Sequence, residues 1–243
     1  MDNPKLLLWL EAPLQSWGFD SKFGRRDTIA FPTKSGVMGL ICSAMGAGGE
    51  EVELLREFSD LRQTVISFVR AKKTSDRLLG YQREIPLRDF QMVGSGYDDE
   101  DPWENLMIPK MSNGKKPVGS GTKMTYRYYL QDAAFAVVLE IPPNKTEVIR
   151  DCLINPVWDL YLGRKSCTPT DFIYRGIFEH ESEAIQKAIS IAEEKHRVED
   201  FRVLQGVLID AEANEVLTLN DVPVQFGPKK RYRDRQVSLF YAG

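Results

Sequence analysis

Residues Leu14–Gly46 read LQSWGFDSKFGRRDTIAFPTKSGVMGLICSAMG and connect the first predicted strand to the first predicted helix. The strand is the apolar run Leu6–Leu10, and the small-residue helix is expected to begin near Lys34. The loop between them carries three cations, namely Lys22, Arg25 and Arg26. Unpaired N–H groups and the helix dipole favour an anion at a helix N-terminus. The segment therefore predicts a phosphate-binding loop that leads into a helix.

Composition limits the classes of protein to consider. The chain has 243 residues, 42% of them hydrophobic, and a formal net charge of −3. It is not basic overall, so any nucleic-acid site must be a local patch. Three scattered cysteines argue against a disulfide framework and a zinc site, and favour a reducing cytoplasm. We expect an intracellular protein without a signal peptide or a membrane span.

The order of predicted elements indicates the fold. Strands are expected at Lys5–Glu11, Thr64–Ala71, Ala133–Ile141 and Asp171–Phe178, and helices at Lys34–Met45, Glu50–Phe58, Thr146–Leu153 and Ser182–His196. Strand–helix–strand occurring twice is the ferredoxin-like arrangement, an α+β fold with an antiparallel sheet and helices on one face, as in RNA-recognition modules. We expect this domain at residues 1–180. Residues 181–243 are expected to add a helix, a β-hairpin (Val203–Ala211 with Glu215–Gln225) and an irregular basic tail packed on the first domain.

Residues 72–131 form an insertion that is too long for a passive loop. It is rich in glycine and proline, and we interpret it as a protruding arm. Between Glu104 and Asp132 there is no acidic residue. The same stretch carries five cations: Lys110, Lys115, Lys116, Lys123 and Arg127. Tyr126, Tyr128 and Tyr129 lie in the same stretch. Cations interleaved with aromatic rings are typical of single-stranded nucleic-acid binding, although a solvated hairpin with inward-packed rings would show the same pattern.

Other features are less specific. Gly36, Gly39, Ser43 and Gly46 give the first helix a flat face, which suits either close helix packing or approach of a ligand to the backbone. The segment Thr33-Lys34-Ser35 fails the Walker pattern, because Thr33 stands where the glycine before the lysine belongs. With two histidines and no spaced ligand motif, metal chemistry is not indicated and no cofactor is expected.

Four collinear stretches carry a family resemblance: Glu11–Gly18 (EAPLQSWG), Phe31–Gly36 (FPTKSG), Asp132–Phe135 (DAAF) and Tyr161–Cys167 (YLGRKSC). In these the chain resembles the CasD family of type I-E CRISPR Cascade complexes, within the RAMP superfamily. The resemblance spans residues 1–178 and weakens beyond about residue 180.

The resemblance implies a ferredoxin-like domain with a thumb, which holds the 5′ handle of the crRNA in a cytoplasmic prokaryotic ribonucleoprotein for antiviral defence. It implies contacts with the backbone subunit CasC and the large subunit CasA, with target DNA met only through the complex and no membrane partner. The residues expected to bind RNA are Gln15, Trp17, Arg25, Arg26, Thr33, Lys34, Ser35, Lys115, Lys116, Lys123, Tyr126, Arg127, Tyr128, Arg164, Lys165 and Ser166.

Catalysis is not expected from this resemblance, but one alternative stays open. The related type I-C subunit cuts its own precursor RNA with a Tyr-Lys-His set. Here neither histidine lies in the arm, which argues against cutting. The alternative is a metal-independent endoribonuclease with Tyr126 and Lys123 as the reacting groups.

Overall fold

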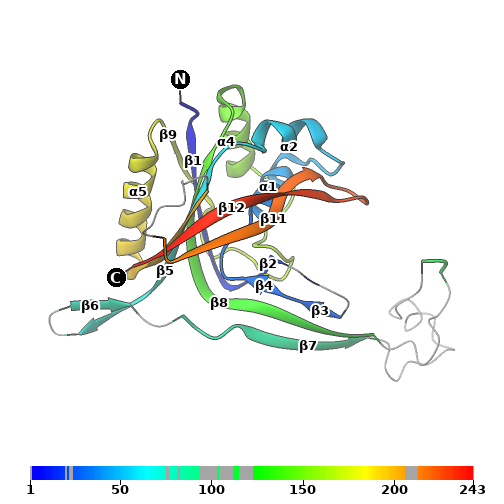
Figure 1. The fold of residues 1–243 in the computed structure, drawn as a ribbon, viewed down its shortest axis with the longest axis horizontal. Helices are drawn as coiled ribbons and strands as arrows, with labels where there is room; N and C mark the ends of the chain where they lie inside the picture. The colour runs from blue at the N-terminus through cyan, green and yellow to red at the C-terminus, as the bar shows by residue number, and fades with distance from the viewer. Residues whose placement is uncertain are drawn as a thin grey trace.

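A computed structural model describes residues 2–19, 21, 24–74, 77–80, 83–93, 103, 112–114, 123–205 and 213–242. Within these residues a large sheet has the strand order β11-β12-β10-β5-β8-β1-β9. Its strands are β1 (Lys5–Gln15), β5 (Gln63–Thr74), β8 (Lys123–Glu140), β9 (Tyr174–Phe178), β10 (Arg197–Gln205), β11 (Glu215–Gln225) and β12 (Arg231–Tyr241). Figure 1 shows the sheet at the centre of the molecule, with a long arm that leaves its lower edge.

Four of these strands form the predicted ferredoxin-like core. They lie in the order β9-β1-β8-β5, and every neighbouring pair is antiparallel. The helices that connect them are α1 (Lys34–Met45) and α2 (Val52–Phe58) between β1 and β5, and α4 (Thr146–Ile154), after the short 3-10 helix η1 (Pro143–Lys145), between β8 and β9. The α+β, ferredoxin-like prediction is confirmed.

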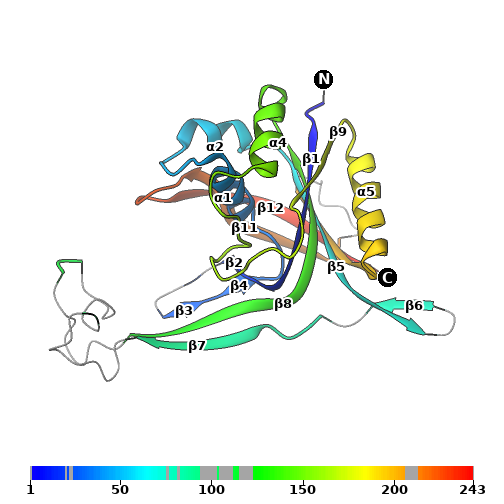
Figure 2. The ribbon, with the colours of Figure 1, turned by 180° about the vertical axis from the view of Figure 1, so that it is seen from behind.

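Both faces of the sheet are covered. Leu8 and Phe135 pack with Ile41 of α1 in one apolar cluster, while Trp9 and Phe68 pack with α5 (Glu181–Glu194) in another. Figures 1 and 2 show α1, α2 and α4 on one side and α5 on the other. The expectation of helices on one face holds for α1, α2 and α4, whereas α5 covers the opposite face. Because alternate residues of a strand face opposite sides, burial on both sides explains why Leu6–Leu10 is apolar without interruption.

The arm is a two-stranded ladder. β7 (Leu87–Val93) pairs with the first part of β8, from Leu87↔Tyr129 to Val93↔Lys123. A second hairpin, β5 with β6 (Arg77–Gly80), leaves the sheet nearby. The sequence predicted an insertion at 72–131, but β8 runs unbroken from the arm into the core. The long strand begins ten positions before the predicted start at residue 133, because its arm half pairs with β7 and β3 instead of with the core strand β5.

The C-terminal segment differs from the prediction. The hairpin joins β11 to β12, and β10 lies between β12 and β5 instead of pairing with β11. The tail expected to be irregular is therefore largely strand β12. Of its cations, Arg231 and Arg233 are exposed, whereas Arg235 is buried against Asp221. Residues 206–212, within the predicted first strand of the hairpin and its turn, lie outside the described residues.

Candidate nucleic-acid interface

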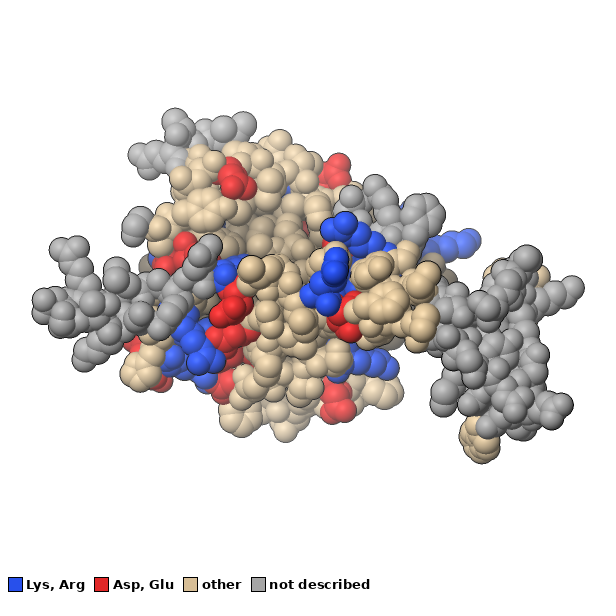
Figure 3. Space-filling model, turned by 90° about the horizontal axis from the view of Figure 1, so that it is seen from below, with Lys and Arg blue, Asp and Glu red and all other residues tan. Residues whose placement is uncertain are grey.

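Three segments that are distant in sequence meet at the root of the arm. The short strand β3 (Arg25–Arg26) pairs in parallel with β8, Arg25 opposite Tyr126 and Arg26 opposite Arg127. The turn at 161–167 joins them, since the Arg164 guanidinium donates to the Arg26 carbonyl oxygen at 2.9 Å. Figure 3 shows Lys and Arg side chains gathered beside the arm, with acidic side chains among them. The loop, the turn and the root of the arm therefore meet at one surface.

Cations and aromatic rings alternate on this surface. The guanidinium carbon of Arg25 lies 5.0 Å from the centroid of the Tyr128 ring, and that of Arg88 lies 5.7 Å from the centroid of the Tyr126 ring. Tyr126 is 44% exposed. A hydrogen bond from Arg25 to Asp27, strengthened by the charge of that carboxylate, raises the pKa of Arg25. The surface offers permanent charge for phosphates and ring faces for bases.

The turn at Gly163 connects this surface to the end of β1. Gly163 has φ 92°, and a Cβ there would lie 1.7 Å from the carbonyl oxygen of Ser16. Ser16 donates from its backbone N–H to Leu162 and from its hydroxyl to the carbonyl of Tyr128 at 3.1 Å. Arg164 is half-buried, and its guanidinium carbon lies 4.6 Å from the centroid of the buried Tyr129 ring. Arg164 thus braces the turn, whereas Lys165 and Ser166 are exposed on it.

A cleft of about 510 Å³ runs from this turn along the small-residue face of α1. An ideal Cβ at Gly39 meets nothing within 4 Å, whereas one at Gly36 would lie 2.7 Å from the ring of Trp17. Gly36 therefore permits packing, and Gly39 keeps the cleft open. Further lining residues supply hydroxyls, rings and one cation from α1, from β12 and from loops: Ser35, Ser43, Tyr161, Phe226, Lys230 and Tyr232.

The N-terminus of α1 already holds an anion from the protein itself. The Asp221 carboxylate accepts a hydrogen bond from the backbone N–H of Lys34 at 2.7 Å, and Arg235 donates to the same carboxylate at 2.6 and 2.8 Å. Thr33 is buried and accepts from the N–H of Gly36. The expected phosphate site at this helix end is therefore wrong, because the Asp221 carboxylate of β11 accepts from the N–H of Lys34 and the Thr33 hydroxyl accepts from that of Gly36.

Three predicted RNA-binding residues belong to the core instead. Lys34 is 0% exposed, and its ammonium donates to the carbonyls of Ser59 and Leu61. Gln15 is also fully buried; its amide donates to Leu10 and Ala133 and accepts from the indole N–H of Trp17, which is buried beside it. These side chains stabilise the junction of β1 and α1, so we withdraw all three from the RNA-binding set.

Comparison with known proteins identifies the family. A family model described as CRISPR-associated protein (Cas_Cas5) matches residues 5–238. The chain belongs to this Cas5 family. A curated relative, the CRISPR system Cascade subunit CasD of Escherichia coli (strain K12), is 30% identical over 177 residues, which cover 70% of each chain. The family resemblance drawn from four motifs is thus confirmed.

Solved structures agree with this assignment. A chain of a structure titled "CRISPR RNA-guided surveillance complex" has 28% sequence identity and a TM-score of 0.67, covering 98% of the Cas5 chain described here and 89% of its own length. A second, titled "Crystal structure of Cas protein", has 25% identity and a TM-score of 0.54, with 98% and 94% coverage.

Some residues that were predicted to bind RNA in this Cas5 protein lie outside the part of the chain that the structure describes. Lys115 and Lys116 lie outside the described residues, and Lys123 begins β8 with its side chain outside them. Arg88, Lys230 and Tyr232 contribute to the interface or cleft but were not predicted to bind RNA. Arg88 shares a face of the ladder with Tyr126, and the sequence did not show which residues of the arm pair with each other. Among the described residues, no group of three His, Cys, Asp or Glu side chains is arranged to hold a metal ion, and no helix is long and apolar enough to cross a membrane.

Buried Lys34 gives a pH-dependent prediction. Burial, together with the charge of Arg235, lowers the pKa of its ammonium to about 8. The unfolded chain holds this proton up to about pH 10.4, so between the two values the unfolded state binds more protons and folding stability rises with pH. We expect the free energy of unfolding of wild type minus that of Lys34→Met to increase from pH 8 to 10, by at most about 1.4 kcal/mol per pH unit. Urea unfolding at pH 8, 9 and 10 measures it, and a constant difference would contradict the assignment.

Proposed function

We propose that this Cas5 protein is a non-catalytic RNA-binding and scaffold subunit of a type I-E Cascade complex. The observation that supports the proposal most is the meeting of loop, turn and arm root, which combines Arg25, Arg26 and Lys165 with the ring of Tyr126. Single-stranded RNA needs such a combination, because cations follow the backbone while rings stack on bases.

The 5′ handle of the crRNA is the RNA that we assign to this surface. The cleft along α1 and the arm root share Ser16 and Gly163, so one strand of RNA has a continuous path from Lys230 and Tyr232 to the arm. The backbone of α1 is accessible at Gly39. Lys115, Lys116 and Lys123 remain assigned to the RNA from their charge alone.

The scaffold role is proposed from the apolar side chains toward the outer end of the arm. Phe90, Met92 and Met124 are 49%, 50% and 59% exposed; they lie on the same face of the ladder as Tyr126, and Met92 and Met124 lie beyond it, farther from the body. An exposed apolar ladder of this kind suits a protein partner. We assign it to the adjacent backbone subunit CasC, and we expect the large subunit CasA to contact the body of the protein. DNA would be met only through the assembled complex.

A salt titration tests the RNA site. We expect Arg25→Ala/Arg26→Ala/Lys165→Ala to bind a labelled handle RNA more weakly, with a log–log salt slope shallower by about 2, because each lost single-strand phosphate contact removes about 0.7. Binding is measured from 50 to 300 mM salt. The control is Arg56→Ala/Arg62→Ala/Lys187→Ala, three exposed cations on other elements, which should leave the slope unchanged if the site is local. Equal slopes for the test variant and wild type would refute the placement.

The endoribonuclease alternative is tested with the same purified wild-type protein. Incubation of wild type with labelled repeat RNA in EDTA should leave the RNA intact under the proposal. A single discrete cut that disappears in Tyr126→Phe would favour the enzyme instead.

A further inference from the structure

β8 changes neighbours at Asp132. On the core side, Ala134 pairs with Phe68 of β5; on the arm side, the first partner on β7 is Leu87, opposite Tyr129. Asp132 itself has φ 46°, a left-handed conformation that Asp tolerates better than most residues. The register against β1 skips this position, passing from Ala12↔Ala133 to Leu14↔Gln131. The arm therefore diverges from β5 at one specific residue.

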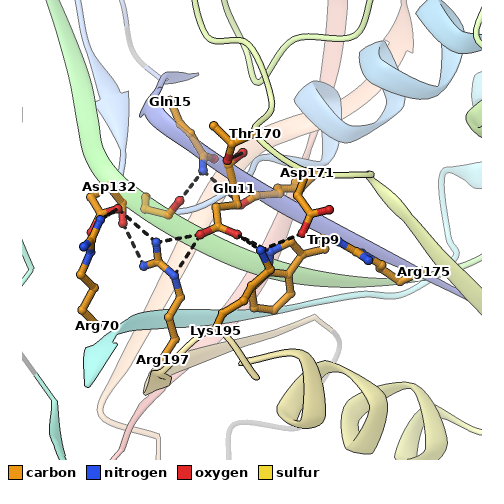
Figure 4. A network of polar contacts seen from close by, with 12 residues as sticks. Trp9, Glu11, Gln15, Arg70, Asp132, Thr170, Asp171, Arg175, Lys195 and Arg197 are labelled. Atoms are coloured by element: carbon orange, nitrogen blue, oxygen red, sulfur yellow. Dashed lines mark hydrogen bonds and ion pairs between the residues drawn. The ribbon is translucent and has the colours of Figure 1, made fainter. Parts of the chain in front are cut away.

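Side-chain ion pairs take over where the backbone ladder between β5 and β8 stops. Arg70 of β5 holds the Asp132 carboxylate with two hydrogen bonds, one of them 2.9 Å. Arg197 of β10 donates to the same carboxylate and to the backbone carbonyl of Asp132, each at 3.1 Å. Figure 4 shows Asp132 between these two guanidinium groups. Both the backbone and the side chain of the bend residue are therefore fixed.

The cluster extends to β1 and α5. Arg197 also donates to the Glu11 carboxylate at 2.9 and 3.2 Å. The Lys195 ammonium nitrogen lies 2.8 Å from a carboxylate oxygen of Glu11 and 2.7 Å from one of Asp171. Burial opposes ionisation of Glu11, but hydrogen bonds from Lys195 and Trp9 and the charge of Arg197 keep its pKa below the usual value. The carboxylate thus stays charged and able to hold Arg197, whose side chain is 4% exposed.

The cluster forms the wall of an open cleft of about 850 Å³ between the diverging strands. Arg83 and Glu84, from the segment that leads to β7, line the other side. The backbone pairing of β8 with β5 ends at this cleft, while the other edge of β8 still pairs with β1 at Gln131 and Leu130. The cluster therefore holds the edge of the bend that faces β5, where the described ladder ends at Ala134.

We propose that Asp132, Arg70, Arg197 and Glu11 are positioning residues that fix the direction of the arm relative to the body. The importance of this direction for RNA rests on the proposed function, but the positioning itself does not. The four residues come from four neighbouring strands, β8, β5, β10 and β1, so the cluster ties the bend in β8 to the rigid sheet.

Spin-label distances in the RNA-free protein test this inference. Labels at Met92→Cys on the arm and Gln186→Cys on α5 report the arm direction, in a Cys152→Ser background because Cys42 and Cys167 are buried. The wild-type background should give a single narrow distance peak. Asp132→Gly keeps a left-handed backbone and removes the carboxylate, and we expect it to lose that peak. Arg70→Gln should do the same, and it carries the test if Asp132→Gly does not fold, since the Arg70 side chain is 68% exposed.

The control is Glu84→Gln, which removes a charge from the same cleft outside the cluster and should keep the narrow peak. A narrow, unshifted peak in folded Asp132→Gly or Arg70→Gln would overturn the positioning role. Because no RNA is present, this result is independent of whether the protein binds the crRNA handle. Failure of the proposed function would instead appear as an unchanged salt slope in the RNA titration.

Discussion

Gly163→Ala is expected to destabilise the protein by about 4 kcal/mol or more and to abolish handle binding. A Cβ at this position would lie 1.7 Å from the carbonyl oxygen of Ser16, and Gly163 has φ 92°, which alanine rarely adopts. The obstructing atom belongs to the backbone of Ser16, directly after β1, so no side-chain rotation relieves the clash. Moving the turn would break the hydrogen bond from the N–H of Ser16 to Leu162, and moving Ser16 would break the bond from its hydroxyl to the carbonyl of Tyr128.

Urea unfolding and RNA binding measure the two effects. The matched control for the urea measurement is Gly39→Ala, also a glycine that lines the cleft, where a Cβ meets nothing within 4 Å. Alanine inside a helix should raise stability there by about 0.5–1 kcal/mol. If Gly163→Ala unfolds at the wild-type urea concentration, the close approach of the turn to β1 is wrong.

Arg235→Met should destabilise the protein by about 3–5 kcal/mol, because it leaves the Asp221 carboxylate buried without its cation. The side chains of Arg235 and Asp221 are 5% and 4% exposed. Asp221 also accepts from the N–H of Lys34, so disturbance of this pair reaches the start of α1.

The control lies two residues away on the same strand. Arg233 pairs with Asp60, and the side chains are 51% and 83% exposed. A surface pair contributes about 0–1 kcal/mol, so Arg233→Ala should change stability little. The double variant Asp221→Leu/Arg235→Met removes both charges and should recover much of the loss. If the Arg233 and Arg235 substitutions lower the free energy of unfolding equally, the buried pair stabilises the protein no more than the exposed pair does.

The core could be predicted because its elements have local signals. Apolar runs, helix periodicity and turn residues marked the strands and helices around Leu6–Leu10, Lys34–Met45 and Ala133–Ile141, and their order indicated the ferredoxin-like topology. Charge and aromatic patterning also placed Arg25, Arg26 and Tyr126 in one candidate surface. The partners of the C-terminal strands were not predictable in this way, because alternation identifies a strand but not its neighbour in the sheet.

The sequence by itself determined the family, the ferredoxin-like core and the presence of a basic arm, since each depends on patterns within short stretches or on motifs in a fixed order. Only the tertiary structure decided which charges are available to a ligand. Lys34 and Arg235 look like surface cations in the sequence, yet both are buried against carbonyls or a carboxylate from distant segments. Arg25 and Lys165 stay exposed. Whether a side chain is buried depends on which distant segments pack over it, and the residues next to it in the sequence do not show this.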